Sequence, residues 1–496
     1  MRRVLIANRG EIAVRIARAC RTLGIECVAV ASDADLGAPH ACAADHMVRI
    51  GPAPARESYL NVPALLEAAR ASGADAVHPG YGFLAENAAF ARAVEGAGLV
   101  WIGPPPDAIA TMGDKLAARK AAAAAGVPLV PGSEVAADDG ERVAAQAEAI
   151  GYPLLVKAAA GGGGKGMRVV GGPGELRGAV QAAAREAEGA FADGRVYLER
   201  LLERPRHVEI QVLLDGHGTA VHLGERECSV QRRHQKIVEE SPCPVLTPAL
   251  RARMAEAALA AARAVAYVNA GTVEFLLDAS GRFYFLEMHT RLQVEHPVTE
   301  LVTGIDMVVA QLRIARGEPL GFTQADVRLD GHAIEVRLYA EDPERGFLPS
   351  AGPLLAWQAP AGPGIRVDAG VASGTTVPVE YDPLLAKIAA WAPTRESAIA
   401  RLRTALGETV ALGPHTNLAF LAEVLDHPAF RAGDTHTAFI DTYLPAWKQP
   451  VPDLDAAAVA AALASGGSLP PAGAGVAAEP TLPTPWERLG RWRLGT

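Results

Sequence analysis

The chain has 496 residues, 50% of them hydrophobic and 21% charged, and its formal net charge is −9 at pH 7. These proportions are typical of a globular protein with enough core for roughly three domains. The negative balance argues against a nucleic-acid-binding surface, which would be basic, and no segment has the apolar length that crossing a membrane requires.

The first 112 residues alternate between short apolar strands and amphipathic helices. Periodicity predicts strands at "RVLIA", "ECVAVAS", "ADAVHPG" and "GLVWIGP", and helices at "GEIAVRIARACRTLG", "NVPALLEAARASG" and "NAAFARAVEGAG". This alternation indicates a doubly wound α/β domain, in which helices cover both faces of a parallel sheet. The turn "NRGEIA" lacks the G-x-G-x-x-G spacing of dinucleotide-binding folds, so we expect no nicotinamide site there.

The next part contains the glycine-rich stretch "KAAAGGGGKGM", residues 157–167. It lies between two strand-like runs, so we expect it at the tip of a hairpin, whereas a P-loop would open a helix. Such a loop can offer backbone N–H groups to a triphosphate, and four glycines alone fit a plain surface loop equally well. Lys157 before the loop and Lys165 within it favour the phosphate interpretation.

The segment "GTVEFLLDASGRFYFLEMHTRLQVEHPVTE", residues 271–300, predicts a hairpin with a two-residue turn at Ser280 and Gly281. That turn would place Glu274 opposite Glu287, with their Cβ atoms about 5 Å apart. Opposed carboxylates repel unless a proton or a cation lies between them, and Mg²⁺ prefers such oxygen ligands. The alternative is a solvated polar face, which the neighbouring Phe, Leu and Tyr residues make less suitable.

Polar residues continue at every second position after Glu287. If the chain stays extended, one side of it presents all of them while Met288, Leu292 and Val294 point the other way. A polar edge strand has the same pattern, but it would not need this set of residue types, so we favour an anion-binding and metal-binding row made of Glu287, His289, Arg291, Gln293 and Glu295.

The C-terminal part begins near residue 320 with short strands such as "HAIEVRLYAEDP" and then a helix from Thr394, which predicts a mainly β domain with a helical end. Residues 466–485 are rich in Gly, Pro, Ala and Ser, a composition typical of linkers.

Taken together, these motifs resemble the biotin carboxylase component of biotin-dependent carboxylases, a branch of the ATP-grasp ligases. The resemblance extends over about residues 1–445, in family order, and rests on "IANRGEIAVRI", "HPGYGFLAEN", "MGDKLAARK", "GGGGKGMRVV", "RHVEIQVLLD", "ECSVQRRHQKIVEESP", "EMHTRLQVEHPVTE" and "YDPLLAKI". It implies an α/β and α+β multidomain protein, whose expected parts are an N-terminal α/β domain (1–112), an ATP-grasp domain (113–325) with a glycine-rich lid (about 131–203), a biotin carboxylase C-terminal domain (326–445), a linker (446–485) and the possible start of a connecting domain (486–496).

The resemblance also implies a role for each matching residue. For ATP it implies that lysines and the lid bind the phosphates and that other residues contact the rest of the nucleotide. The residues concerned are Lys115, Lys157, Gly162, Gly163, Gly164, Lys165, Gly166, Glu199, Leu201, His207, Gln231 and His234. For bicarbonate it implies a site with Lys236, Arg291, Gln293 and Val294. Glu295 corresponds to the base that deprotonates bicarbonate, and Arg337 to the group that stabilises the biotin enolate.

The implied metal ligands are Glu274 and Glu287, and at the third position the family has asparagine where this chain has His289. An imidazole nitrogen suits Mn²⁺ or another transition metal better than Mg²⁺. We expect His289 to bind the metal weakly or through a water, and to titrate near neutrality.

Family members with a fused carrier hold biotin on the lysine of an A-M-K-M tetrapeptide, but the last methionine here is Met307 and the last lysine is Lys448. We therefore expect biotin to arrive on another polypeptide, unless the sequence is part of a longer chain. The ending "PWERLGRWRLGT" resembles the start of the connecting domain in α subunits of methylcrotonyl- or geranyl-CoA carboxylases. Expected partners are a biotin carrier, a carboxyltransferase subunit and further copies of the chain.

Two other functions stay open at this point: an ATP-grasp ligase with a different acceptor, and a non-catalytic scaffold subunit in which His289 marks the loss of activity. The five cysteines form no C-x-x-C pair, and the charged N-terminus lacks the apolar run of a signal peptide. Both features favour free thiols in the cytoplasm.

Overall fold

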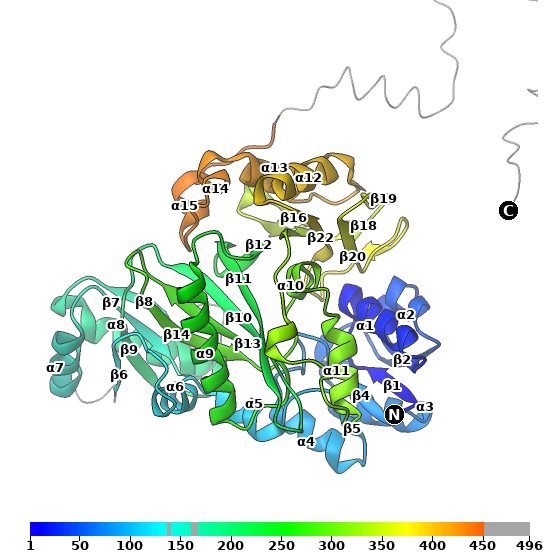
Figure 1. Ribbon diagram of the computed structural model, residues 1–496, viewed down its shortest axis with the longest axis horizontal. Helices are drawn as coiled ribbons and strands as arrows, with labels where there is room; N and C mark the ends of the chain where they lie inside the picture. The colour runs from blue at the N-terminus through cyan, green and yellow to red at the C-terminus, as the bar shows by residue number, and fades with distance from the viewer. Residues whose placement is uncertain (136–139, 160–166, 451–496) are drawn as a thin grey trace, which may run out of the picture. The chain divides into compact units, whose positions relative to one another are not determined.

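The computed structural model of the protein describes residues 1–135, 140–159 and 167–450 (Figure 1). The predicted loop residues Gly162, Gly163, Gly164, Lys165 and Gly166 lie outside the described residues, as do most of the expected linker and all of residues 486–496. The account below concerns the unit formed by residues 1–449.

The N-terminal sheet is parallel, as the alternation of strands and helices predicts, and its strand order is β3-β2-β1-β4-β5. Its strands are β1 (Arg3–Ile6), β2 (Glu26–Ser32), β3 (His46–Gly51), β4 (Ala76–His78) and β5 (Val100–Trp101). On one face of the sheet, Ile6 of β1 packs in the same core as Ile16 of α1. On the other face, Leu5 of β1 packs in a core with Leu65 of α3 and Phe90 of α4. The helices of this part are α1 (Gly10–Thr22), α2 (Pro39–Ala43), α3 (Val62–Ser72), α4 (Ala88–Gly96), α5 (Pro106–Gly113) and α6 (Lys115–Ala124). Strand β3 was not predicted from the sequence.

A second, four-stranded sheet has the order β6-β9-β7-β8 and falls within the predicted lid. Its elements are β6 (Gly132–Val135), α7 (Gly140–Ile150), β7 (Leu154–Ala158), β8 (Arg168–Val170), α8 (Pro173–Phe191) and β9 (Val196–Arg200). Strands β7 and β8 pair antiparallel on either side of the glycine stretch, which confirms the predicted strand–loop–strand arrangement.

The largest sheet has eight strands in the order β14-β13-β10-β11-β12-β15-β22-β20, and all its recorded pairings are antiparallel. The strands are β10 (Arg206–Leu214), β11 (Ala220–Arg232), β12 (Gln235–Ser241), β13 (Asn269–Leu277), β14 (Phe283–His289), β15 (His332–Tyr339), β20 (Ile365–Ala369) and β22 (Leu384–Ala392). Because β12 pairs with β15, the sheet passes without interruption across the domain boundary expected near residue 325.

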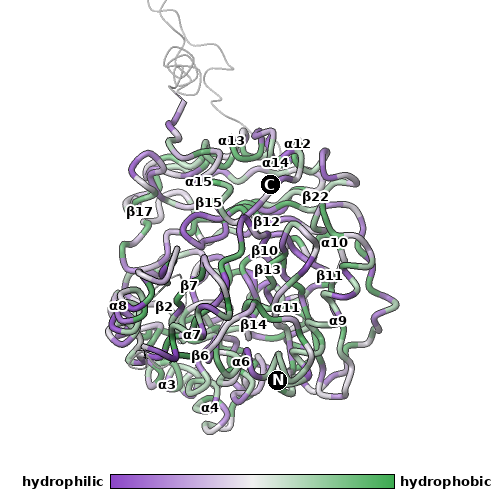
Figure 2. Tube along the Cα trace, turned by 90° about the vertical axis from the view of Figure 1, so that its left-hand side faces the viewer, coloured by the Kyte–Doolittle hydropathy of each residue, from purple (hydrophilic) through white to green (hydrophobic). Residues whose placement is uncertain are grey.

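Helices cover both faces of this sheet (Figure 1). The apolar residues Val208, Ile210 and Val212 of β10 pack with Met254 of α9 (Pro248–Ala264), so the alternate residues of β10 point to the opposite face. On that opposite face lie α10 (His296–Thr303) and α11 (Met307–Ala315). Figure 2 shows hydrophobic stretches along inner strands such as β15 and β22, where Ile334, Val336 and Ile388 are fully buried.

The C-terminal part is strand-rich and ends in helices, as predicted. It adds β16 (Glu341–Asp342), β17 (Leu348–Pro349), β18 (Gly352–Pro353), β19 (Ala356–Gln358), β21 (Thr376–Val377), β23 (Val410–Leu412), α12 (Arg395–Glu408), α13 (Leu418–Asp426), α14 (Pro428–Arg431) and α15 (Phe439–Tyr443). The predicted start of α12 is confirmed, because the Thr394 side chain accepts a hydrogen bond from the Ser397 backbone N–H. All five cysteines are free thiols. Across the described ranges, no helix combines the length and apolar character needed to cross a membrane.

Gly271 in β13 tests how tightly the large sheet packs. A Cβ atom at this position would lie 2.6 Å from the ring of Tyr267, which is buried and donates its hydroxyl to the Ala270 carbonyl. We expect Gly271→Ala to lower the free energy of unfolding by about 1 to 3 kcal/mol, because the buried ring has to move. Urea unfolding followed by circular dichroism measures this.

The matched control is Gly189→Ala within α8, where an added Cβ meets no atom within 4 Å. Alanine restricts the unfolded chain and favours the helix, so this variant should gain about 0.5 to 1 kcal/mol. Equal stabilities of the two variants would contradict the packing at Gly271.

Candidate active site

The predicted hairpin between β13 and β14 places Glu274 opposite Glu287, as the sequence analysis expected. The turn itself differs from the prediction, because Asp278 pairs with Arg282 around a three-residue loop in which Gly281 has a φ of 80°. This loop shifts the register by one residue, and a β-bulge between Glu274 and Phe275 shifts it back. The predicted pair is therefore correct, although the predicted turn is wrong.

Carboxylates form a row across three strands, since Glu274 of β13 is the register partner of both Glu287 of β14 and Glu209 of β10. Glu209 was missed in the sequence, although the alternation in "RHVEIQV" places it on the same side of β10 as His207. Arg226 of β11 continues the row as the partner of Glu209, and its guanidinium contacts the Glu209 carboxylate. Glu209 and Arg226 are fully buried.

One end of this row can hold a divalent metal ion. Ligand atoms of Glu274, Glu287 and His289 lie within 4.8 Å of one another. His289 Nε2 is 3.1 Å from Glu274 Oε1 and 3.7 Å from Glu287 Oε1, and His207 Nε2 is 2.9 Å from Glu274 Oε2. Two carboxylates and an imidazole form a donor set that suits Mn²⁺ and can also bind Mg²⁺. The three residues therefore fit the implied metal.

His289 does not behave as the sequence analysis expected. Burial by itself would lower the pKa of His289, but Glu274 and Glu86 raise it well above the usual 6.5, against the opposing effect of Arg291. The imidazole therefore carries a proton near neutral pH, and this imidazolium occupies the position between the carboxylates. The expectation that it titrates near neutrality is wrong, because these two acids stabilise its charged form.

Lys236 brings three carboxylates together beside the metal cluster. Its Nζ donates to Glu209 at 2.6 Å, to Glu274 at 2.6 Å and to Glu295 at 2.7 Å. Burial would lower the pKa of Lys236, but the three carboxylates raise it well above its ordinary value, so the ammonium stays charged. This contact joins the predicted bicarbonate site to the predicted metal site.

Glu295 is buried between two cations. Its second carboxylate oxygen accepts a hydrogen bond from Arg337 Nη2 at 3.0 Å, and Arg337 Nε donates to Glu239 at 2.6 Å. Burial would raise the pKa of Glu295, but Lys236, Arg337 and Arg226 hold it well below its ordinary value. These cations therefore keep Glu295 in its ionised form.

The segment after β14 is not the extended row that period two predicted. The strand ends at His289, and residues 290–295 form a loop that leads into α10. Gln293 and Glu295 reach the site from this loop, where Gln293 donates to Glu274 at 2.9 Å and accepts from Arg226 at 2.6 Å. The alternating pattern thus identified residues that lie close together in the structure, but a loop brings them there and not the predicted extended strand.

Arg291 is held by a residue that the sequence analysis did not single out. Its Nε donates to Glu86 Oε2 at 3.1 Å, while the other oxygen of Glu86 lies 3.2 Å from His289 Nδ1. Burial would raise the pKa of Glu86, but Arg291 and His289 lower it. Glu86 lies in the matched segment "HPGYGFLAEN", so only the resemblance pointed to its neighbourhood.

The predicted phosphate lysines meet at the start of α6 and the end of β7. Lys157 is buried and forms an ion pair with Glu199, whose other oxygen accepts from Arg119 at 2.6 Å. The pKa of Lys115 is lowered by burial and by Lys157, although Glu287 and Glu199 act in the opposite direction. Lys115 thus stands within electrostatic reach of both the metal cluster and the lid.

Three further predicted nucleotide residues, Leu201, Gln231 and His234, have partners or positions of their own. Gln231 is buried and donates to the Cys228 carbonyl at 3.2 Å. Arg233 and His234 form the turn between β11 and β12, both with positive φ, as a two-residue hairpin turn requires. The backbone N–H of Leu201 donates to the Pro153 carbonyl at 3.1 Å, next to the lid sheet.

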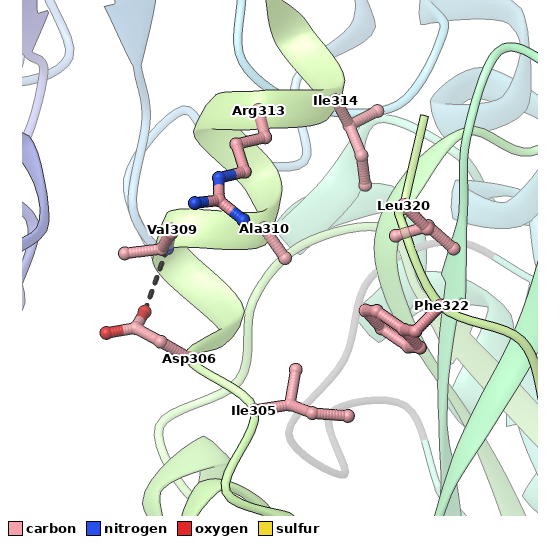
Figure 3. A pocket seen from close by; sticks show the side chains of 8 residues that line it. All are labelled: Ile305, Asp306, Val309, Ala310, Arg313, Ile314, Leu320 and Phe322. Carbon is pink, nitrogen blue, oxygen red and sulfur yellow. Dashed lines mark hydrogen bonds between the residues drawn. The ribbon is translucent and has the colours of Figure 1, made fainter. Parts of the chain in front are cut away.

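A separate pocket of about 250 Å³ lies beside α11 (Figure 3). Its lining is mainly apolar, and its charged residues are Asp306, which accepts from the Val309 N–H at 2.8 Å, and Arg313. It includes none of the carboxylates or lysines described above, so it is separate from the candidate active site.

Three protein families match this chain in succession. Residues 1–109 match the biotin carboxylase N-terminal domain, residues 114–323 the ATP-binding domain of the carbamoyl-phosphate synthase L chain, and residues 335–442 the biotin carboxylase C-terminal domain.

Curated relatives are about half identical to this chain. The propionyl-CoA carboxylase alpha chain of Ruegeria pomeroyi is 50% identical over 93% of this chain and 71% of its own length. The mitochondrial methylcrotonoyl-CoA carboxylase subunit alpha of Oryza sativa subsp. japonica is 51% identical over 89% of this chain, which spans only 60% of that relative. The biotin carboxylase of Allochromatium vinosum is 51% identical over 89% of this chain and 98% of its own length.

Among solved structures, the biotin carboxylase domain dimer of the Hydrogenobacter thermophilus 2-oxoglutarate carboxylase is similar, with a TM-score of 0.87 and 44% identity. The match covers 91% of this chain and 99% of that one. That structure was determined with MgADP, ADP and bicarbonate.

The protonation of His289 predicts how metal binding depends on pH. A metal ion needs the neutral imidazole nitrogen, and the raised pKa keeps this nitrogen protonated near neutrality, so binding has to release a proton. We expect the affinity for Mg²⁺ and Mn²⁺ to rise with pH, by up to about tenfold per pH unit below the pKa. Isothermal titration calorimetry at pH 7 and pH 8.5, in buffers of different ionisation enthalpy, measures the affinity and the released proton.

His289→Asn is the matched variant, because the amide offers an oxygen ligand and has no proton to lose. It should bind Mg²⁺ more tightly than the wild type at pH 7, with little change between the two pH values and a smaller preference for Mn²⁺. Identical pH dependence in both proteins would show that His289 does not face the ion.

Proposed function

The chain belongs to the biotin carboxylase family, and we propose that it carboxylates biotin with bicarbonate and ATP through carboxyphosphate, as the first half-reaction of an acyl-CoA carboxylase. The observation that carries this proposal is Glu295, a buried carboxylate held at 2.7 Å from Lys236 and 3.0 Å from Arg337. This arrangement supplies a base beside two cations that can hold an anion.

Bicarbonate is a weak nucleophile, so its proton has to leave as it attacks the γ-phosphorus. In our proposal bicarbonate enters among Lys236, Arg291 and Gln293, next to the loop that contains Val294. Lys236 then shares its charge with the new anion, and the negative charge beside Glu295 raises the pKa of that carboxylate. Substrate binding would thus convert a weakly basic, ion-paired Glu295 into a base able to accept the proton.

The developing charge on the transferred phosphoryl group needs fixed cations. We assign Lys115 and Lys157 to the phosphates of ATP, with the glycine loop as the lid that excludes water from carboxyphosphate. Glu274, Glu287 and His289 would hold the metal, which when bound neutralises negative charge on the phosphate oxygens. We place Glu199, Leu201, His207, Gln231 and His234 around the nucleotide on the strength of the resemblance.

For the second step we assign Arg337 to the ureido oxygen of biotin. A guanidinium is always charged at neutral pH, so it can stabilise the oxyanion that forms when the biotin nitrogen loses its proton. Arg337 is held by Glu239, which accepts a hydrogen bond from its Nε at 2.6 Å.

The proposed partners follow from the relatives rather than from the site. The chain spans 71% and 60% of two carboxylase alpha chains, so we propose that a biotin carrier and a carboxyltransferase subunit complete the reaction. We also propose a homo-oligomer, since the similar solved structure is described as a dimer. Free thiols suit a reducing compartment, which supports a cytoplasmic location.

The test of the base is Glu295→Gln. Glutamine keeps the size of the side chain, and Lys236 retains Glu209 and Glu274 as partners, so the site should stay folded. We expect nucleotide binding to persist while biotin carboxylation falls by about a hundred-fold or more. The measurement is ADP release that depends on both bicarbonate and biotin, with fluorescent nucleotide titration as the binding control.

Glu225→Gln provides a matched control for the loss of a buried, ion-paired carboxylate. Glu225 in β11 is fully buried, and its carboxylate lies 2.6 Å from Arg251 of α9. Its substitution should leave carboxylation within a few-fold of the wild type. Near-normal activity of Glu295→Gln would remove this residue from the proposed role.

A further inference from the structure

A lysine in β22, the strand next to the β20 edge of the large sheet, is almost completely buried although the proposed reaction gives it no role. Lys387 lies in β22, is 1% exposed, and is the register partner of both Arg337 in β15 and Asp368 in β20. A buried ammonium is costly unless its hydrogens find acceptors. Its partners therefore indicate why the sheet has a lysine at this position.

The acceptors of Lys387 come from distant parts of the chain. Its Nζ donates to the backbone carbonyl of Val294 at 2.9 Å and lies 3.2 Å from Glu11 Oε1, in the first turn of α1. The Tyr81 hydroxyl donates to the same oxygen of Glu11. Glu11, Tyr81 and Lys387 lie in three of the segments that carry the family resemblance, "GEIAVRI", "HPGYGFLAEN" and "YDPLLAKI". None of the three residues belongs to the substrate sites assigned above.

Glu11 is itself fixed in place by close backbone packing. The backbone N–H of Glu11 would lie 2.5 Å from a Cβ atom at Gly370, so only glycine allows the chain after β20 to approach α1 this closely. Burial raises the pKa of Glu11, while Lys387 lowers it. Close packing thus fixes the backbone of Glu11, and the Tyr81 hydroxyl holds the carboxylate oxygen that faces Lys387.

The carbonyl that Lys387 holds belongs to the peptide that joins Val294 to Glu295. This peptide lies in the loop between β14 and α10, where no sheet ladder fixes the backbone. A hydrogen bond to the Val294 carbonyl fixes the plane of the peptide and with it the direction in which the Glu295 side chain leaves the backbone. Lys387 is also the register partner of Arg337, the second cation that contacts Glu295.

We propose that Lys387, held by Glu11, is a positioning residue that sets the orientation of Glu295 toward bicarbonate. This inference rests on the proposed function, since it takes Glu295 as the base. Lys387 itself contacts no substrate in this scheme. The contact would explain why an acid at the start of α1 and a lysine in β22, 376 positions apart, meet beneath the bicarbonate site.

The test compares Lys387→Met with the double variant Glu11→Gln/Lys387→Met. The single variant should lower kcat/KM for bicarbonate by about a hundred-fold, with the KM for ATP little changed, because a small misplacement of a reacting group has such effects. The double variant removes both members of the pair between Lys387 and Glu11, and Asp368, which lies 3.9 Å from Lys387, keeps Arg366 as a partner. Its melting temperature should therefore return toward that of the wild type. Its bicarbonate defect should nevertheless persist.

The control for general destabilisation is Arg395→Met, which breaks another largely buried ion pair, to Glu240 at 2.6 Å, without touching the site. It should lower the melting temperature and leave the KM for bicarbonate unchanged. A double variant with wild-type turnover would show that the lysine only balances charge, and would overturn the inference. A wild-type chain without bicarbonate-dependent turnover would contradict the proposed function, and the role of Lys387 with it.

Discussion

The contact between Lys236 and three buried carboxylates is the interaction on which the rest of the site depends. Glu209, Glu274 and Glu295 come from two strands and a loop, and without a cation among them they could not all be ionised in a buried position. Arg226 serves the same purpose on the far side of Glu209. The sheet can therefore carry a row of acids through its interior only because neighbouring strands supply the matching cations.

Because of this balance, Lys236 and Arg291 already have carboxylate partners before any substrate binds. An incoming anion has to take hydrogen bonds that Lys236 and Arg291 now give to Glu295 and Glu86, and the acids that lose a partner then need another cation. A divalent ion at Glu274 would meet that need. Anionic substrate and metal should accordingly support each other's binding, because each offsets the charge imbalance that the other creates.

The sequence predicted the opposed glutamates and the parallel N-terminal sheet, because both follow from local periodicity. The hairpin register came out right through two compensating differences, a longer turn and a β-bulge at Glu274, and no local pattern signals such a bulge. Glu209, Arg226 and Lys387 could not be identified in the same way, because their roles depend on which strands become neighbours in the sheet. The roles of single residues came from the resemblance, which finds segments but does not say what each side chain touches.

The continuity of the large sheet explains why Glu295 is held from both sides. Strand β12 carries Lys236 at one end and Glu239 near the other, and β15 pairs directly with it and carries Arg337. The part of the chain expected to form a separate C-terminal domain thus contributes one of the two cations on Glu295 through ordinary strand pairing. A cut at the expected boundary near residue 325 would remove Arg337 and expose the edge of β12, so Glu295 keeps its second cation only while the sheet is whole.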